Sequence, residues 1–170
     1  FINIDMFKFY EVATSLKKDA NFNKEKNEAL AIAYGRTSFN RYYYACYLSA
    51  RDLVKQLLPG TKFLHGAAPE LIEKNVVQLI KQNSQKQQKN GLINIREYSR
   101  IITTTNQSAA EIARILRVGY MIRGIADYEP EVIVVFKNDT FSLEKHTESE
   151  ASSWLGAVDL HKGKILRNAK

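Results

Sequence analysis

Arginine, asparagine and tyrosine side chains recur at helical spacing in the middle of the chain's second apolar segment. The set comprises Arg36, Asn40, Tyr44, Tyr47 and Arg51, which stand four, four, three and four residues apart. This spacing places two guanidinium groups, one amide and two phenols on one stripe of a helix. Guanidinium groups bind phosphate through paired hydrogen bonds, and aromatic rings stack on RNA bases. The stripe therefore predicts a surface that binds phosphate or RNA, although a solvated helix face would have the same pattern.

The other side of the same segment is apolar. Its members follow one another at alternating spacings of four and three: Phe39, Tyr43, Cys46, Ala50, Leu53 and Leu57. Such a repeat forms one continuous seam on a helix. The sequence therefore predicts a long core helix that begins near residue 28, with or without a break at Gly35, and ends before Pro59 and Gly60.

Further apolar periods and cap residues predict most of the remaining elements. We expect helices over residues 6–20, 69–80, 93–102 and 109–128, and a last helix that begins at the capping box Thr147–Glu150. Residues 103–106 are expected to separate two of these helices, with Asn106 or Ser108 as the cap. The polar tract 81–91 predicts a mobile loop, and residues 131–136 predict at most one short strand. The fold class is all-α, a bundle of about five to six helices.

Composition sets the bounds on domain number and partners. A chain of 170 residues with 45% hydrophobic content favours one domain over residues 1–170. The net charge of +7 favours polyanionic partners, although lysine-rich surfaces also serve solubility. The chain has one cysteine, Cys46, and no long apolar run, so we expect a cytoplasmic protein without a membrane span. Met6 is a plausible initiator, and residues 1–5 an extension before it.

Three blocks of the sequence together resemble the HEPN domain family. They are the segment 40–51 (NRYYYACYLSAR), Leu64-His65-Gly66, and the segment 115–130 (ILRVGYMIRGIADYEP). The resemblance implies an up-and-down helical bundle that is often a homodimer. It also implies a role in prokaryotic toxin–antitoxin or antiviral defence systems or in RNA processing, beside a partner such as a nucleotidyltransferase or a larger effector.

Many HEPN proteins are metal-independent ribonucleases, whose signature is an arginine followed by four to six residues and a histidine. No arginine here is followed by histidine at that spacing. After Arg123, Tyr128 occupies the position where the signature has its histidine. RNA cleavage without metal needs a base, an acid and a cationic group at the phosphorane. Arg123 suits the cationic role, whereas a phenol with a pKa near 10 is a poor base. His65 could enter a site that folding assembles with Arg51 and Arg123.

Several of these residues also have structural interpretations. Arg123 and Asp127 are four residues apart and can form an ion pair, and Trp154 lies on an apolar stripe. His146 and His161 are expected to face solvent, too far apart to share a metal. We expect no metal and no cofactor.

Three functions remain open from the sequence. The first is an RNA-binding HEPN-like protein with absent or altered cleavage, in which RNA lies between protomers. The second is a catalytically silent module for dimerisation or partner binding. The third is a nucleotide-sensing module, although no glycine-rich phosphate loop is present.

Overall fold

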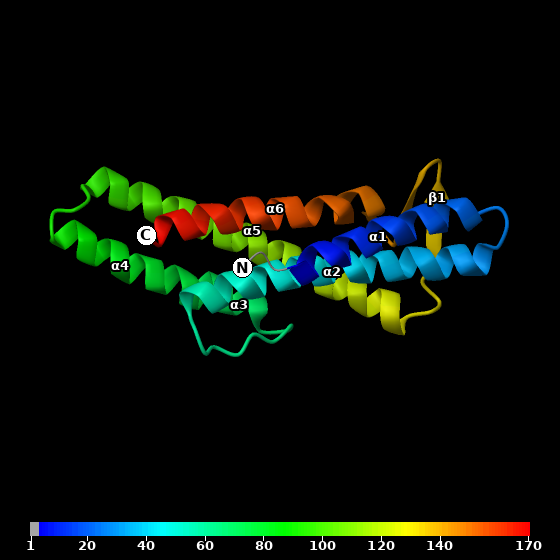
Figure 1. Cartoon of the computed structure of the whole chain (residues 1–170), viewed down its shortest axis with the longest axis horizontal. Helices are drawn as coiled ribbons and strands as arrows, with labels where there is room; N and C mark the ends of the chain where they lie inside the picture. The colour runs from blue at the N-terminus through cyan, green and yellow to red at the C-terminus, as the bar shows by residue number, and fades with distance from the viewer. Residues whose placement is uncertain (1–3) are drawn as a thin grey trace. The chain divides into compact units, whose positions relative to one another are not determined.

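The computed structural model describes residues 4–170, and most of these residues are helical (Figure 1). In chain order the elements are α1 (Ile4–Asn23), α2 (Glu28–Leu57), α3 (Ala68–Leu71), the π-helical turn η1 (Ile72–Val76), α4 (Val77–Lys89), α5 (Ile95–Tyr128), β1 (Val134–Lys137), β2 (Thr140–Leu143), β3 (His146–Thr147) and α6 (Glu148–Asn168). The prediction of an all-α bundle with a small strand segment is confirmed. No helix in the described range is both long and apolar enough to cross a membrane.

The described residues form two compact units. Unit one contains residues 4–48 and 117–156, and unit two contains residues 49–116 and 157–170. Helices α2, α5 and α6 each contribute residues to both units. The single domain expected over residues 1–170 stays a prediction, and the extension expected over residues 1–5 lies largely outside the described residues.

Unit one has an aromatic core between its helices and a small sheet. Phe39 and Tyr43, from the predicted seam of α2, are buried, as is Trp154 of α6. The ring centroids of Phe39 and Phe141 are 5.9 Å apart, which joins α2 to strand β2. The sheet has the order β1-β2-β3, and both pairs are antiparallel. The seam predicted from the sequence is therefore the seam that packs.

Gly119 sets how closely α5 approaches α2 within unit one. A Cβ atom at this position would lie 2.8 Å from Cδ2 of Tyr43, which is closer than carbon atoms pack. Gly124, five residues later on the same helix, has no atom within 4 Å of such a Cβ. The absence of a side chain at Gly119 is therefore required by packing.

This difference predicts opposite effects for two identical substitutions. We expect Gly119→Ala to lower the free energy of unfolding by about 1–3 kcal/mol, because the methyl group overpacks the Tyr43 ring. Gly124→Ala is expected to be neutral or to stabilise by about 0.5–1 kcal/mol, because alanine favours the helix. Urea unfolding followed by circular dichroism measures both. Equal effects of the two substitutions would contradict the packing argument.

Unit two is held by aliphatic packing and by a polar line between helices. Ile72, Ile80, Ile112 and Leu116 are among its fully buried side chains. Asp52 of α2 accepts a hydrogen bond from Lys162 Nζ at 2.6 Å. Further polar contacts link the helices of this unit: Ser49 Oγ donates to Asp159 Oδ1 at 2.5 Å, and Asn168 Nδ2 donates to Thr105 Oγ1 at 3.0 Å.

The expected mobile loop over residues 81–91 is wrong for residues 81–89, which continue α4. Lysine and glutamine are good helix formers, and the helix needs to bury only Ile80 and Ser84. The helix ends in a Schellman motif: Leu92 N donates to Gln87 O at 2.9 Å, and Gly91 has φ +72°. The polar composition therefore marks an exposed helix rather than a loop.

The helix break expected over residues 103–106 is also absent. Helix α5 runs without interruption from residue 95 to residue 128, and Thr105 and Ser108 are buried in it. Its capping box is Asn94–Glu97, where Glu97 N donates to Asn94 Oδ1 at 2.9 Å and Asn94 N donates to Glu97 Oε2 at 3.0 Å. Thr105 accepts a hydrogen bond from Asn168 of α6, and a threonine with such a partner is compatible with a helix interior.

The strand region is larger than expected. The segment predicted as one strand over residues 131–136 contributes β1 from residue 134, and two further strands pair beside it. A two-residue turn at Asn138 and Asp139 connects β1 to β2, and Asn138 has φ +54°, a value that asparagine tolerates. The hairpin has no Asn-Gly or Asp-Gly signal, which explains why the sequence pattern did not predict it.

Candidate functional site

A cluster of polar residues lies on the facing sides of α2 and α5 in unit one. We call Asn40, Tyr44, Arg123 and Asp127 the Arg123 cluster. Asn40 Nδ2 donates to Asp127 Oδ1 at 2.7 Å, and Arg123 Nε donates to Asp127 Oδ2 at 3.1 Å. The Arg123 guanidinium carbon lies 5.7 Å from the centroid of the Tyr44 ring. One carboxylate thus links the amide of α2 to the guanidinium of α5.

Regular helix geometry assembles this cluster. Asn40 and Tyr44 are four residues apart on α2, and Arg123 and Asp127 are four residues apart on α5, so each pair lies on one side of its helix. The two helices approach closely beside these stripes, because a Cβ atom at Gly119, one turn before Arg123, would lie 2.8 Å from Cδ2 of Tyr43. Helical spacing together with one close approach therefore positions all four side chains.

Only one edge of the Arg123 guanidinium is used by the protein. Among the described residues only Nε of Arg123 makes a hydrogen bond. The two terminal amino groups make none, and neither is fully buried. Its side chain is 20% exposed. Burial acts to lower the pKa of Arg123, but Tyr44 and Asp127 oppose burial and the net pKa is raised. The group is a fixed cation whose two terminal amino groups make no hydrogen bond among the described residues.

Aromatic rings surround the cluster. Tyr44 stacks on Phe9 of α1 with a centroid distance of 5.8 Å, and Tyr43 lies 6.0 Å from Tyr120. Tyr43 is buried, and burial raises the pKa of its phenol, so it stays neutral. Tyr120 and Tyr128 are 43% and 73% exposed.

Arg36 has a structural role in unit one, and the binding role expected for it stays a prediction. Its Nε donates to Ala126 O at 2.9 Å, its Nη2 donates to Ile125 O at 2.7 Å and to Glu129 O at 2.8 Å, and its Nη1 donates to Val132 O. The last carbonyl groups of a helix have no partner within the helix. Arg36 therefore caps the carboxyl end of α5, and little of its guanidinium is left for a ligand.

The remaining predicted site residues are divided between the two units. Tyr47 belongs to unit one but is buried, with its ring 6.1 Å from Tyr43. Arg51 and His65 belong to unit two, where both are half-buried. A site assembled from His65, Arg51 and Arg123 stays a prediction. Tyr128 ends α5, one residue after Asp127, and its phenol contributes to the raised pKa of Arg123.

The histidines expected to face solvent are partly enclosed. His146 is 8% exposed, and its Nδ1 lies 3.2 Å from Glu150 Oε2. His161 is half-buried, with its Nδ1 3.1 Å from Ser108 Oγ. Burial, helped by Lys164, lowers the pKa of His161 below its ordinary value. Each histidine has a local partner, which the sequence spacing alone did not indicate.

A buried carboxylate was missed by the sequence patterns. Glu148, the first residue of α6, is 0% exposed; it accepts a hydrogen bond from Tyr42 Oη at 2.8 Å, and Lys17 Nζ lies 2.6 Å from it. Burial, followed by the Glu148 contact, raises the pKa of Tyr42. The carboxylate joins α1, α2 and α6, so its role is to hold unit one together. Its position directly after the cap residue Thr147 was the only available signal.

The chemistry that the residues of the Arg123 cluster could support is anion binding. The cluster has a fixed cation and one half-buried phenol, Tyr44, but no histidine among its members. Within residues 4–170 no group of three histidine, cysteine, aspartate or glutamate residues is placed to hold a metal ion.

No protein-family model, curated protein or solved structure matches the chain.

Proposed function

We propose that this chain is a HEPN-like protein of a prokaryotic defence or toxin–antitoxin system, which acts in the cytoplasm and binds RNA through the Arg123 cluster. The observation that carries the proposal is the anchoring of Arg123. Asp127, which also accepts a hydrogen bond from Asn40, accepts one from Nε of its guanidinium, while the terminal amino groups make no hydrogen bond among the described residues. Planar guanidinium groups with two open donors bind phosphate oxygens in pairs.

The choice of RNA over a free phosphate or nucleotide is supported by the rings beside Arg123. Tyr120 and Tyr128 are on α5, and both are more than two-fifths exposed. Single-stranded RNA is bound by cations that contact phosphates and by rings that stack on unpaired bases. The net charge of +7 adds long-range attraction for a polyanion.

We propose that the chain binds RNA without cleaving it efficiently. A metal-free ribonuclease needs a base that is ready to accept a proton near neutral pH, and phenols with ordinary pKa values near 10 are not. The Arg123 cluster supplies the cationic donor for a phosphorane, but its carboxylate Asp127 is already engaged by Arg123 and Asn40. Bound RNA is therefore expected to stay intact.

The test is a titration of the protein with a labelled transfer RNA pool, in EDTA, at several salt concentrations. We expect binding whose logarithmic salt dependence corresponds to several phosphate contacts, at about 0.7 per contact for a single strand. Gel analysis of the same samples is expected to show uncut RNA. Absence of binding at low salt, or binding that salt does not weaken, would contradict the proposal.

A second function, a silent module for dimerisation or partner binding, is favoured by one observation. Tyr120, Met121 and Tyr128 are all exposed on the same helix of unit one. Tyrosine and methionine are enriched at protein interfaces. If the protein forms a concentration-dependent dimer in sedimentation experiments and does not bind RNA, this second function replaces the first.

A further inference from the structure

Strand β1 has one edge that no strand covers. The sheet order β1-β2-β3 places β1 at the border, and β2 occupies its inner side. The backbone groups of Lys137 and Val135 point toward β2, where these residues lie opposite Thr140 and Ser142. This follows because a two-residue turn joins the strands. The N–H and C=O groups of Val134 and Phe136 consequently point outward. They are the kind of unpaired backbone groups that accept another strand.

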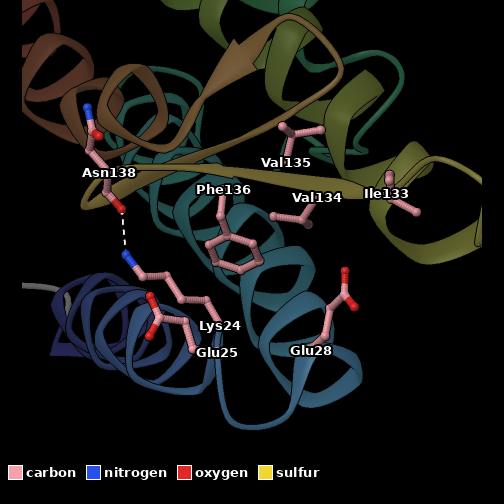
Figure 2. A pocket seen from close by; sticks show the side chains of 8 residues that line it. All are labelled: Lys24, Glu25, Glu28, Ile133, Val134, Val135, Phe136 and Asn138. Atoms are coloured by element: carbon pink, nitrogen blue, oxygen red, sulfur yellow. Dashed lines mark hydrogen bonds between the residues drawn. The ribbon is translucent and has the colours of Figure 1, made fainter.

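A groove runs along this outer edge (Figure 2). It has a volume of about 460 Å³, and one wall is formed by β1 and the residues at its two ends. The other wall is the turn from α1 to α2, which contributes Lys24, Glu25 and Glu28. Val134 and Phe136 point toward the helices, whereas Val135 points to the opposite side of the strand. The groove therefore offers backbone donors and acceptors beside apolar side chains.

The wall opposite β1 is acidic. Glu25 and Glu28 are both exposed, and neither makes a hydrogen bond or an ion pair with its side chain among the described residues. Lys24 is the only cation in the lining, and its Nζ donates to Asn138 O at 2.7 Å, which holds the ammonium group at the turn of the hairpin. Two open carboxylates thus face the groove in a chain whose net charge is +7.

We propose that this groove binds an extended peptide, which pairs with the outer edge of β1 and directs lysine or arginine side chains toward Glu25 and Glu28. Peptides commonly bind in this way: main-chain hydrogen bonds supply affinity, and the side chains that alternate toward the wall supply specificity. The four residues of β1 limit the paired segment to a short stretch. Apolar residues of the peptide would extend the surface formed by Ile133 and Val135, which are 58% and 54% exposed.

The charges favour such a peptide over a second copy of this chain. Two copies joined through their β1 edges would bring both pairs of Glu25 and Glu28 to one shared groove. Carboxylates that are brought close together in one groove repel one another. A basic peptide instead neutralises the two carboxylates.

The test uses the full chain labelled with nitrogen-15 and two short capped peptides, one of alternating lysine and valine and one of alternating glutamate and valine. We expect the lysine peptide to give saturable shifts of the amide signals of residues 133–137, with an affinity at least about tenfold above that of the glutamate peptide. The double variant Glu25→Lys with Glu28→Lys is expected to reverse this preference. The matched control Glu11→Lys with Asp19→Lys makes the same charge change at exposed positions of α1 and is expected to keep it.

Three results would overturn the proposal. The first is the absence of saturable shifts at residues 133–137 with either peptide, while circular dichroism shows a folded protein. The second is equal weakening of lysine-peptide binding by both double variants, which would indicate general charge attraction. The third is concentration-dependent shifts of the same signals without peptide, which would assign the edge to a second copy.

Discussion

Arg123→Ala is expected to weaken RNA binding at least about tenfold, and to lower the logarithmic salt dependence by about the amount of one phosphate contact. The substitution removes the only guanidinium that the Arg123 cluster contains, and the open amino groups of that guanidinium are the proposed phosphate donors. Fluorescence anisotropy with labelled transfer RNA at several salt concentrations measures both quantities.

Arg100→Ala is the matched control, because it removes the same charge from the same helix at an exposed position. A loss confined to Arg123→Ala supports a defined site. Arg123→Lys separates charge from geometry, since lysine keeps the charge but lacks the planar fork. Equal losses in Arg100→Ala and Arg123→Ala would show that RNA responds only to total charge.

Arg36→Met is expected to lower the free energy of unfolding by about 2–4 kcal/mol, because hydrogen bonds from a charged donor to partly buried carbonyl groups are lost together. Four carbonyl groups at and just after the end of α5 lose a charged donor in this variant, although those of Ile125 and Glu129 keep a backbone donor. Methionine retains most of the apolar length of the side chain, so the loss reports on the guanidinium. Urea unfolding followed by tryptophan fluorescence and by circular dichroism gives the value.

The same variant distinguishes the structural role of Arg36 from the binding role that the sequence predicted. At a temperature where Arg36→Met is folded, its RNA affinity is expected to stay within about threefold of the wild type. The reason is that loss of one charge outside the binding site weakens binding only slightly. A stable variant that no longer binds RNA would reassign Arg36 to the binding surface.

The sequence predicted the helices that bury a complete apolar stripe. The seam through Phe39, Tyr43 and Leu53 gave α2 with nearly its observed ends, and the capping box at Thr147 gave the start of α6, where Glu150 N donates to Thr147 Oγ1 at 3.1 Å. It failed where polar residues form helix, as in α4 and over residues 103–106. Helix propensity and contacts with neighbouring helices decide those segments, and neither produces an apolar period.

The candidate site was only partly predictable, for a similar reason. Spacing placed Asn40 with Tyr44, and Arg123 with Asp127, on common helix faces, and both pairs belong to the Arg123 cluster. The same stripe also contained Arg36, whose partners are carbonyl groups at the end of another helix. Tertiary packing decides where the end of one helix lies relative to another helix. The periodicity of a single segment carries no information about that packing.

The most direct measurement of the central proposal is nuclear magnetic resonance of the arginine side chains during titration with RNA in EDTA. We expect the Nε–H signal of Arg123 to shift with the binding curve, because its guanidinium contacts phosphate, while the signal of Arg36 keeps its position. An Arg123 signal that stays constant while RNA binds elsewhere on the protein would contradict the assignment of the Arg123 cluster as the RNA-binding site.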